Sequence, residues 1–235
     1  MSSSLRVSSV RLFGTATFVL LMGAPALAKP PPLATRESEM ATCLPGELAT
    51  WPDGQDRPAP SAAVRLMYWH AGAPARFTEA MVVGALQRAA SAWSACGVPS
   101  DVGNEATLGL DPANEVQVRW NDEATRGNFA LADVGQRRVW LSNAMFALLA
   151  TRNPRHPAHE TLQMAISHEV GHFYGLMAHS RRCVDVMSYY SFGPAGAEQR
   201  CSVRAGGDIK AVVEYRALLP TACDIARCRA VNGKR

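Results

Sequence analysis

The feature that most constrains this chain is a pair of histidines, His168 and His172, inside an apolar stretch. A spacing of four residues places both imidazoles on one face of an α-helix, one turn apart. Ile166, Val170 and Phe173 lie around them and give that helix a buried side. Neutral histidine pairs are seldom buried without partners. The stretch therefore predicts a buried helix whose two histidines bind one ion together. The alternative is a helix in which they are ordinary polar or core residues.

Glu169 completes an H-E-x-x-H arrangement between these two histidines. It lies about 100° around the helix from His168, so its carboxylate can approach a water on a metal ion without being a ligand itself. This arrangement is the signature of zinc metalloproteases, in which the glutamate is the general base. Catalytic zinc sites usually have three protein ligands and one open position. A third ligand must therefore come from elsewhere in the chain.

The candidates for this third ligand follow a glycine. Gly175 can adopt a positive φ and end the helix, which would let the chain turn back beneath the metal. His179 is the predicted third ligand, and Asp185 is the alternative oxygen ligand. Met187 comes next, and its thioether is a poor zinc ligand beside three imidazoles. We therefore expect Met187 to form a hydrophobic floor under the site.

This stretch resembles the metzincin clan of metallopeptidases, whose pattern is H-E-x-x-H-x-x-G-x-x-H followed by a Met-turn. The chain matches that pattern position for position from His168 to Gly175. Beyond the glycine, three residues instead of two precede the last histidine, so Ala178 stands where the pattern has histidine. The resemblance implies a zinc site in which a bulge of one residue brings His179 to the metal.

Two further resemblances concern the end of the stretch. The interval from His179 to Met187 resembles that of matrixins, and Tyr189 matches the Met-x-Tyr pattern of astacins and serralysins. In the latter families this tyrosine binds zinc or stabilises the tetrahedral intermediate. Tyr189 is therefore a candidate catalytic residue, and the alternative is a packed wall residue. Calcium (Ca2+) occurs in many metzincins, although the scattered acidic residues of this chain form no EF-hand pattern.

The remaining pattern predicts an α+β fold. Three segments are predicted strands: Val64–Trp69, Glu115–Trp120 and Arg138–Ser142. Phe77–Cys96 is a predicted helix that Thr78 caps and Gly97 ends. This order resembles the matrixin and astacin catalytic domain, which implies a twisted mixed sheet, a backing helix and an active-site helix. Asp208–Tyr215 resembles the closing helix of matrixins, within a mostly helical or irregular C-terminal subdomain.

The first residues predict a secretory signal peptide over residues 1–28. Arg6 and Arg11 accompany an apolar segment, and Ala26–Ala28 matches an A-x-A cleavage site, with cleavage after Ala28. The alternative, an uncleaved anchor, is disfavoured because glycines and a proline interrupt a segment that is short for a membrane span. The chain is therefore expected to be secreted or periplasmic, with no stable membrane association.

Composition excludes one class of partner. Removal of residues 1–28 takes two of the 24 Lys and Arg residues and none of the 20 Asp and Glu residues, which leaves a net charge near +2. This balance gives no electrostatic case for binding nucleic acid. Residues 29–60 are rich in proline and are predicted to be an extended N-terminal arm or a short pro-segment. Residues 61–235 are predicted to form the catalytic domain.

The six cysteines predict three disulfides in an exported chain. Local spacing favours Cys183–Cys201 and Cys223–Cys228, and elimination then leaves Cys43–Cys96, although sequence alone leaves the pairing open. Cys43 could instead bind zinc in a zymogen, as the cysteine switch of matrixins does. That alternative is disfavoured because it would leave an odd number of cysteines for disulfides.

The leading functional prediction is a monomeric, secreted zinc endopeptidase that acts on a peptide or protein substrate. His168, His172 and His179 would bind one Zn2+ ion, and Glu169 would act as general base for an activated water. The alternatives are a non-catalytic zinc-binding or adhesion protein on a degenerate metzincin scaffold, and a zinc hydrolase of a non-peptide amide.

The remaining histidines are expected to be structural. His156 and His159 could form a second metal site, but a solvated loop and a helix start near Thr161 is the favoured interpretation, because no third ligand is spaced to join them. His70 is likewise expected to have a structural role.

Overall fold

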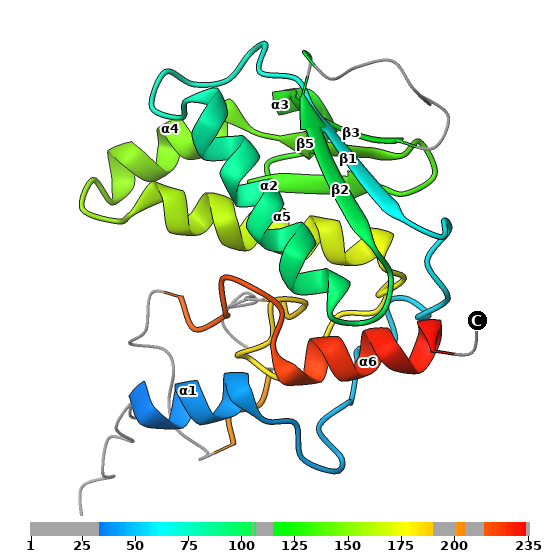
Figure 1. The fold of residues 1–235 in the computed structure, drawn as a ribbon. Coiled ribbons are helices and arrows are strands. Elements are labelled where there is room, and N and C mark those ends of the chain that lie inside the picture. Colours follow the sequence, from blue (N-terminus) through cyan, green and yellow to red (C-terminus); the bar gives the residue numbers. More distant parts are fainter. Residues whose placement is uncertain (1–32, 105, 107–114, 190–200, 205–213, 234–235) are drawn as a thin grey trace, which may run out of the picture.

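The structure, a computed structural model, describes residues 33–104, 106, 115–189, 201–204 and 214–233 (Figure 1). The predicted signal peptide and most of the predicted helix Asp208–Tyr215 lie outside these residues. Tyr215 is described, and it is not helical. In Figure 1 the sheet is covered on one face by helices α2 and α5, and α6 and α1 lie beyond these helices.

The fold is α+β and contains a five-stranded mixed sheet with the strand order β2-β1-β3-β5-β4. Its strands are β1 (Val64–Tyr68), β2 (Ser100–Asn104), β3 (Glu115–Trp120), β4 (Ala130–Asp133) and β5 (Arg138–Leu141). β2, β1, β3 and β5 run parallel, whereas β4 pairs antiparallel with β5 and forms an edge of the sheet. The three predicted strands are confirmed as β1, β3 and β5. β2 and β4 were not predicted, because their mostly half-buried residues show no clear alternation.

Helix α2 (Glu79–Ser94) confirms the prediction of a backing helix. The Thr78 side chain accepts a hydrogen bond from the Met81 N–H, as expected of an N-cap, and Gly97 follows the helix with φ of 96°. Trp93 is fully buried on α2, and its indole N–H donates to the carbonyl of Ser167 on α5 at 2.9 Å. The two helices are therefore fixed to each other within the main hydrophobic core.

Helix α5 (Ala158–Phe173) carries the H-E-x-x-H stretch, and 11 of its 16 residues are buried. Its apolar residues include Ile166, Val170 and Phe173, which confirms the predicted buried side. The helix begins after Pro157, so the expected start near Thr161 is three residues late. Thr161 instead forms a side-chain hydrogen bond with the His156 ring at 2.7 Å.

Four helices were not predicted: α1 (Leu33–Ala41), α3 (Asp122–Thr125), α4 (Asn143–Arg152) and α6 (Ala222–Asn232). Three of them carry a start signal in the sequence. Asn121 caps α3 by accepting the Ala124 N–H. Ser142 caps α4, and Thr221 forms a capping box with Asp224 at the start of α6. α1 lies in the segment that was predicted to be an extended arm or pro-segment.

Three disulfides connect all six cysteines, and two of the predicted pairs are wrong. Cys183–Cys201 is confirmed, whereas the other bonds are Cys43–Cys223 and Cys96–Cys228. Cys223 and Cys228 both lie on α6, where five residues correspond to about 7.5 Å along the axis and about 140° of rotation. Their side chains therefore diverge and cannot be bridged. The Cys43 disulfide also contradicts the cysteine-switch alternative.

These disulfides indicate that the chain folds in an oxidising compartment. Among the residues that the structure describes, no helix combines the length and apolar character that a membrane crossing requires.

Candidate metal centre

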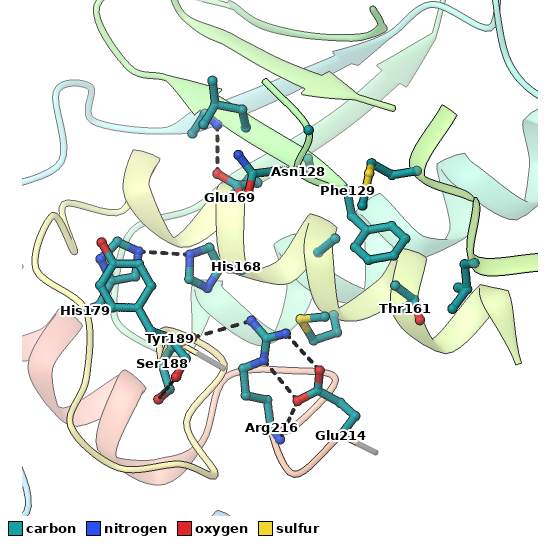
Figure 2. A pocket seen from close by; sticks show the side chains of 18 of the residues that line it. Asn128, Phe129, Thr161, His168, Glu169, His179, Ser188, Tyr189, Glu214 and Arg216 are labelled. Atoms are coloured by element: carbon teal, nitrogen blue, oxygen red, sulfur yellow. Dashed lines mark hydrogen bonds and ion pairs between the residues drawn. The ribbon is translucent and has the colours of Figure 1, made fainter. Parts of the chain in front are cut away.

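Three histidine side chains come together between α5 and the loop that follows it. Figure 2 shows two of them, His168 and His179, facing each other. Their potential ligand nitrogens, on His168, His172 and His179, lie within 4.8 Å of one another. The Nε2 atoms of His168 and His179 are 3.1 Å apart. His168 is buried, and the side chains of His172 and His179 are only 12% and 13% exposed. The chain therefore holds three imidazoles at a site largely closed to solvent.

Each imidazole is oriented through its Nδ1 atom. The Nδ1 of His168 lies 2.7 Å from the Val186 carbonyl oxygen, and that of His172 lies 2.7 Å from the Leu176 carbonyl oxygen. The Nδ1 of His179 lies 2.7 Å from a carboxylate oxygen of Asp53. Carbonyl and carboxylate oxygens accept hydrogen bonds, so each Nδ1 carries the proton and each Nε2 presents a lone pair.

This arrangement fits a divalent metal ion. Burial is the largest effect on these groups and lowers the pKa of all three histidines, that of His172 to about 4, so the rings are neutral near pH 7. The Nε2 atoms of His168 and His179, 3.1 Å apart, then face each other with their lone pairs and without a proton between them. A metal with bonds of about 2.0–2.1 Å in tetrahedral geometry would bring its nitrogen ligands to about 3.3 Å from one another. The histidine group could therefore hold such an ion.

His179 reaches the group because one aspartate and one arginine side chain, Asp56 and Arg227, hold the longer loop. Gly175 has φ of 96° and redirects the chain after α5. The N–H groups of Met177 and Ala178 both donate to one oxygen of Asp56, at 2.9 and 3.0 Å. Arg227 pairs with Asp56 at 2.7 Å and also donates to the carbonyl of Ala178 at 2.7 Å.

Asp185, the alternative third ligand, does not lie among the three histidines. It is fully buried, and its carboxylate accepts hydrogen bonds from the hydroxyls of Ser180 and Thr221, each at 2.6 Å. It also pairs with Arg182 at 2.9 Å. Its contacts show a structural role beneath the loop.

Met187 is fully buried against α5. A Cβ atom at Gly171, between the two helical histidines, would collide with the Met187 sulfur and with the Trp93 ring. Met187 therefore packs directly below this part of the helix, as expected for a hydrophobic floor.

Glu169 lies beside the histidines with its carboxylate turned toward the sheet (Figure 2). One oxygen accepts the Ala132 N–H of strand β4 at 2.7 Å and lies 4.0 Å from Nε2 of His172. Burial raises the pKa of Glu169 to about 7, although the Ala132 hydrogen bond and the charge of Arg216 act to lower it. A carboxyl group with this pKa can both take and give a proton near neutral pH.

Tyr189 covers the outer side of the site. Its ring stacks on that of His179 with 3.7 Å between centroids, and 44% of the residue is exposed. Burial and a hydrogen bond to Asp53 raise the pKa of Tyr189 to about 12, so its hydroxyl stays protonated and can donate.

A cleft of about 870 Å³ opens beside the three histidines and Glu169. One side is formed by residues 127–132, which include most of the edge strand β4, and the other by Ser188, Tyr189, Glu214 and Arg216. Arg216 and Glu214 form an ion pair at 2.8 Å. The cleft also has apolar lining, contributed by Phe129, Met145, Leu149 and Met164.

The other histidines have different surroundings. His156 contacts Thr161, and Nδ1 of His70 lies 2.8 Å from the Tyr68 hydroxyl. Neither belongs to a group that could hold a metal within the described part of the chain; the second such group there comprises Cys43, Glu47 and Cys223, whose cysteines are joined in a disulfide.

Sequence reasoning missed Asp53 and Asp56, which lie in the W-P-D-G-Q-D stretch of the proline-rich arm. Two acidic residues three positions apart in a turn-rich segment were the available signal. Their partners, however, lie more than 120 residues later in the chain.

Comparison with known proteins adds little. No protein-family model matches the sequence, and no curated protein matches it. A solved structure titled "GM1 bound form of the ECX AB5 holotoxin" is similar over 78% of this chain and 91% of that chain, with a TM-score of 0.40 and 11% sequence identity. A similarity at this level carries no argument about function.

Proposed function

We propose that this protein is a secreted, metzincin-like zinc endopeptidase. The observation that carries this proposal is the convergence of three neutral imidazoles whose Nε2 lone pairs face one point, with the carboxyl group of Glu169 beside them. A structural zinc site has no use for an additional carboxyl group with a pKa near neutrality. The chain begins with a predicted signal peptide, and its disulfides suit export.

The histidines would hold zinc through their Nε2 atoms, and their Nδ1 hydrogen bonds would keep the rings in place. When bound, zinc polarises a substrate carbonyl and lowers the pKa of water to about 7. Glu169 would take a proton from the attacking water and pass it to the leaving nitrogen. The Tyr189 hydroxyl could donate a hydrogen bond to the developing oxyanion if it leaves the Asp53 carboxylate, to which it is hydrogen-bonded.

An extended peptide is the substrate that suits the cleft. Strand β4 is an edge of the sheet and lines the cleft, so the outward backbone groups that Glu169 does not engage can pair with a peptide strand. The apolar lining around Phe129 and Met164 can accept an apolar side chain of that peptide. A peptide bond placed along β4 would lie within reach of Glu169, which already accepts the Ala132 N–H of that strand.

The decisive experiment compares the wild type with Glu169→Gln. We expect both proteins to bind one zinc ion with similar affinity, and only the wild type to cleave members of a peptide library. The amide cannot take a proton, so the rate should fall by about 10²–10⁴-fold. Removal of zinc with a chelator should abolish cleavage by the wild type, and added zinc should restore it.

Other outcomes would favour another function. Zinc binding without cleavage by either protein would support a non-catalytic zinc-binding protein, for which the displacement of His179 by one residue is the supporting observation. Cleavage of small amides but not of peptides would support a hydrolase of non-peptide amides.

A further inference from the structure

The N-terminal arm docks along the loop that carries His179. The arm and the loop run antiparallel: the Trp51 N–H donates to the His179 carbonyl at 2.9 Å, and Thr50 forms an isolated bridge with Ser180. Further along, the Arg57 N–H donates to the Gly175 carbonyl at 3.0 Å. Residues 50–57 therefore follow the whole loop from its start at Gly175 to Ser180.

At two positions the backbones of the arm and the loop approach too closely to leave room for any side chain. A Cβ at Gly175 would collide with the Arg57 carbonyl, and a Cβ at Gly54 would collide with the Met177 carbonyl. Each segment thus has a glycine where the backbone of the other approaches. The Cys43–Cys223 disulfide, which precedes residues 50–57, attaches the same arm to helix α6.

Asp53 is the arm residue that touches the metal centre. One carboxylate oxygen accepts the backbone N–H of His179 at 3.1 Å, and the other accepts its Nδ1–H at 2.7 Å. The Tyr189 hydroxyl also hydrogen-bonds to Asp53. The Asp53 side chain is 25% exposed. One carboxylate therefore binds both the backbone and the ring of the same histidine.

We propose that Asp53 is a positioning residue of the metal centre and that residues 50–57 are a permanent part of it, not a removable pro-segment. This inference rests on the proposed function in assuming that the three histidines bind zinc. The Asp53 carboxylate holds the proton on Nδ1 of His179, which leaves Nε2 unprotonated and directed at the other two histidines. It thereby fixes the orientation of the one histidine that lies on a loop and not on helix α5.

An inhibitory pro-segment would use its acidic residue differently. To block a zinc site, the carboxylate must lie on the side of the ion, next to the Nε2 atoms. Asp53 contacts the opposite edge of the His179 ring, and it does not belong to the group of ligand atoms within 4.8 Å of one another. Its placement supports the ligand set and leaves the metal position open.

The test uses the full mature chain with the substitutions Asp53→Asn and Asp53→Ala. Glu47→Gln is the matched control, because Glu47 is another partly exposed carboxylate of the arm that binds the Leu44 N–H and Arg204. Zinc affinity is measured by competition with a chromophoric chelator. The protonated nitrogen of His179 is identified in metal-free protein from the ¹⁵N chemical shifts of its ring, which report directly on the hydrogen bond between Nδ1 and the Asp53 carboxylate.

We expect both Asp53 variants to lose about 10–100-fold in zinc affinity, with the larger loss for alanine, and the proton of His179 to redistribute between Nδ1 and Nε2. Glu47→Gln should keep the Nδ1 proton and a zinc affinity within threefold of the wild type. Unchanged affinity and an unchanged Nδ1 proton in Asp53→Ala would overturn the proposal, as would an equal loss of affinity in Glu47→Gln.

These results remain distinguishable from a failure of the proposed function. A wild type that binds zinc but cleaves no peptide would contradict the protease assignment and leave the Asp53 result intact. A wild type that cleaves peptides while Asp53→Ala retains full zinc affinity would contradict only the positioning role.

Discussion

The two candidates for the third metal ligand, His179 and Asp185, have different surroundings. His179 directs Nε2 toward His168, whereas Asp185 is enclosed by Ser180, Thr221 and Arg182. The two candidates for the third ligand are therefore separated by their surroundings, although the sequence places them only six positions apart.

We predict that His179→Ala lowers zinc affinity by more than the 10–100-fold that is typical of an outer partner, because it removes one of three nitrogen ligands. Asp185→Ala should instead lower the free energy of unfolding by about 3 kcal/mol, since it removes the shortest ion pair of buried Arg182 and leaves, among the described residues, only Glu47, at 3.7 Å, as its acidic partner. Chelator competition and urea unfolding measure the two effects separately. Equal loss of zinc in both variants would contradict the assignment of His179.

At the scale of elements, the backbone turn at the end of α5 decides where the third histidine lies. Gly175 combines a positive φ with close contact to the arm, so two independent constraints require glycine there. Gly97, which follows α2, has the same φ of 96° but would meet nothing within 4 Å of an added Cβ. A comparison of substitutions at Gly175 and Gly97 therefore separates the cost of backbone strain from the cost of disturbing the contact with the arm.

We predict that Gly175→Ala lowers the free energy of unfolding by about 3 kcal/mol or more, as the sum of strain and overpacking. Gly97→Ala should cost about 1–2 kcal/mol through strain alone. Only Gly175→Ala should also weaken zinc binding, because the arm and the loop of His179 must separate to admit the methyl group. Urea unfolding with and without zinc tests both statements; equal costs would show that the arm contact is unimportant.

At the scale of the whole molecule, disulfides join segments that are distant in sequence. The cysteines of the Cys43–Cys223 disulfide are 180 residues apart in the sequence, whereas those of Cys183–Cys201 are 18 residues apart. The first bond ties the arm to α6, and the arm supplies Asp53 and Asp56 to the metal-binding loop. The Cys43–Cys223 disulfide is therefore expected to contribute both to the stability of the fold and to the position of the arm residues that contact the metal-binding loop.

We predict that replacing both Cys43 and Cys223 with alanine costs more stability than replacing Cys183 and Cys201. In the chain-entropy description a tenfold longer loop adds about 2 kcal/mol to the stabilisation. The first double variant should also lose zinc affinity, since the arm is released from α6. Urea unfolding and chelator competition on both variants provide the measurement, and a larger cost for the Cys183–Cys201 pair would contradict it.

Local sequence patterns account for much of the architecture. The alternation in Glu115–Trp120 and the apolar face and Thr78 cap of α2 predicted those elements, because such signals need only neighbouring residues. The spacing of His168 and His172 likewise predicted a shared face on a buried helix. β2, β4 and the start of α5 lack such signals, and the capping box of α6 was overlooked.

Sequence by itself thus determined the helix that carries two of the histidines and the identity of the third candidate, since helical periodicity and residue chemistry are local properties. Tertiary structure alone decided the rest: which cysteines pair, how Asp56 and Arg227 accommodate the longer loop, and that Asp53 supports His179. These contacts join residues more than 40 positions apart, and only the packing of the whole chain brings such residues together.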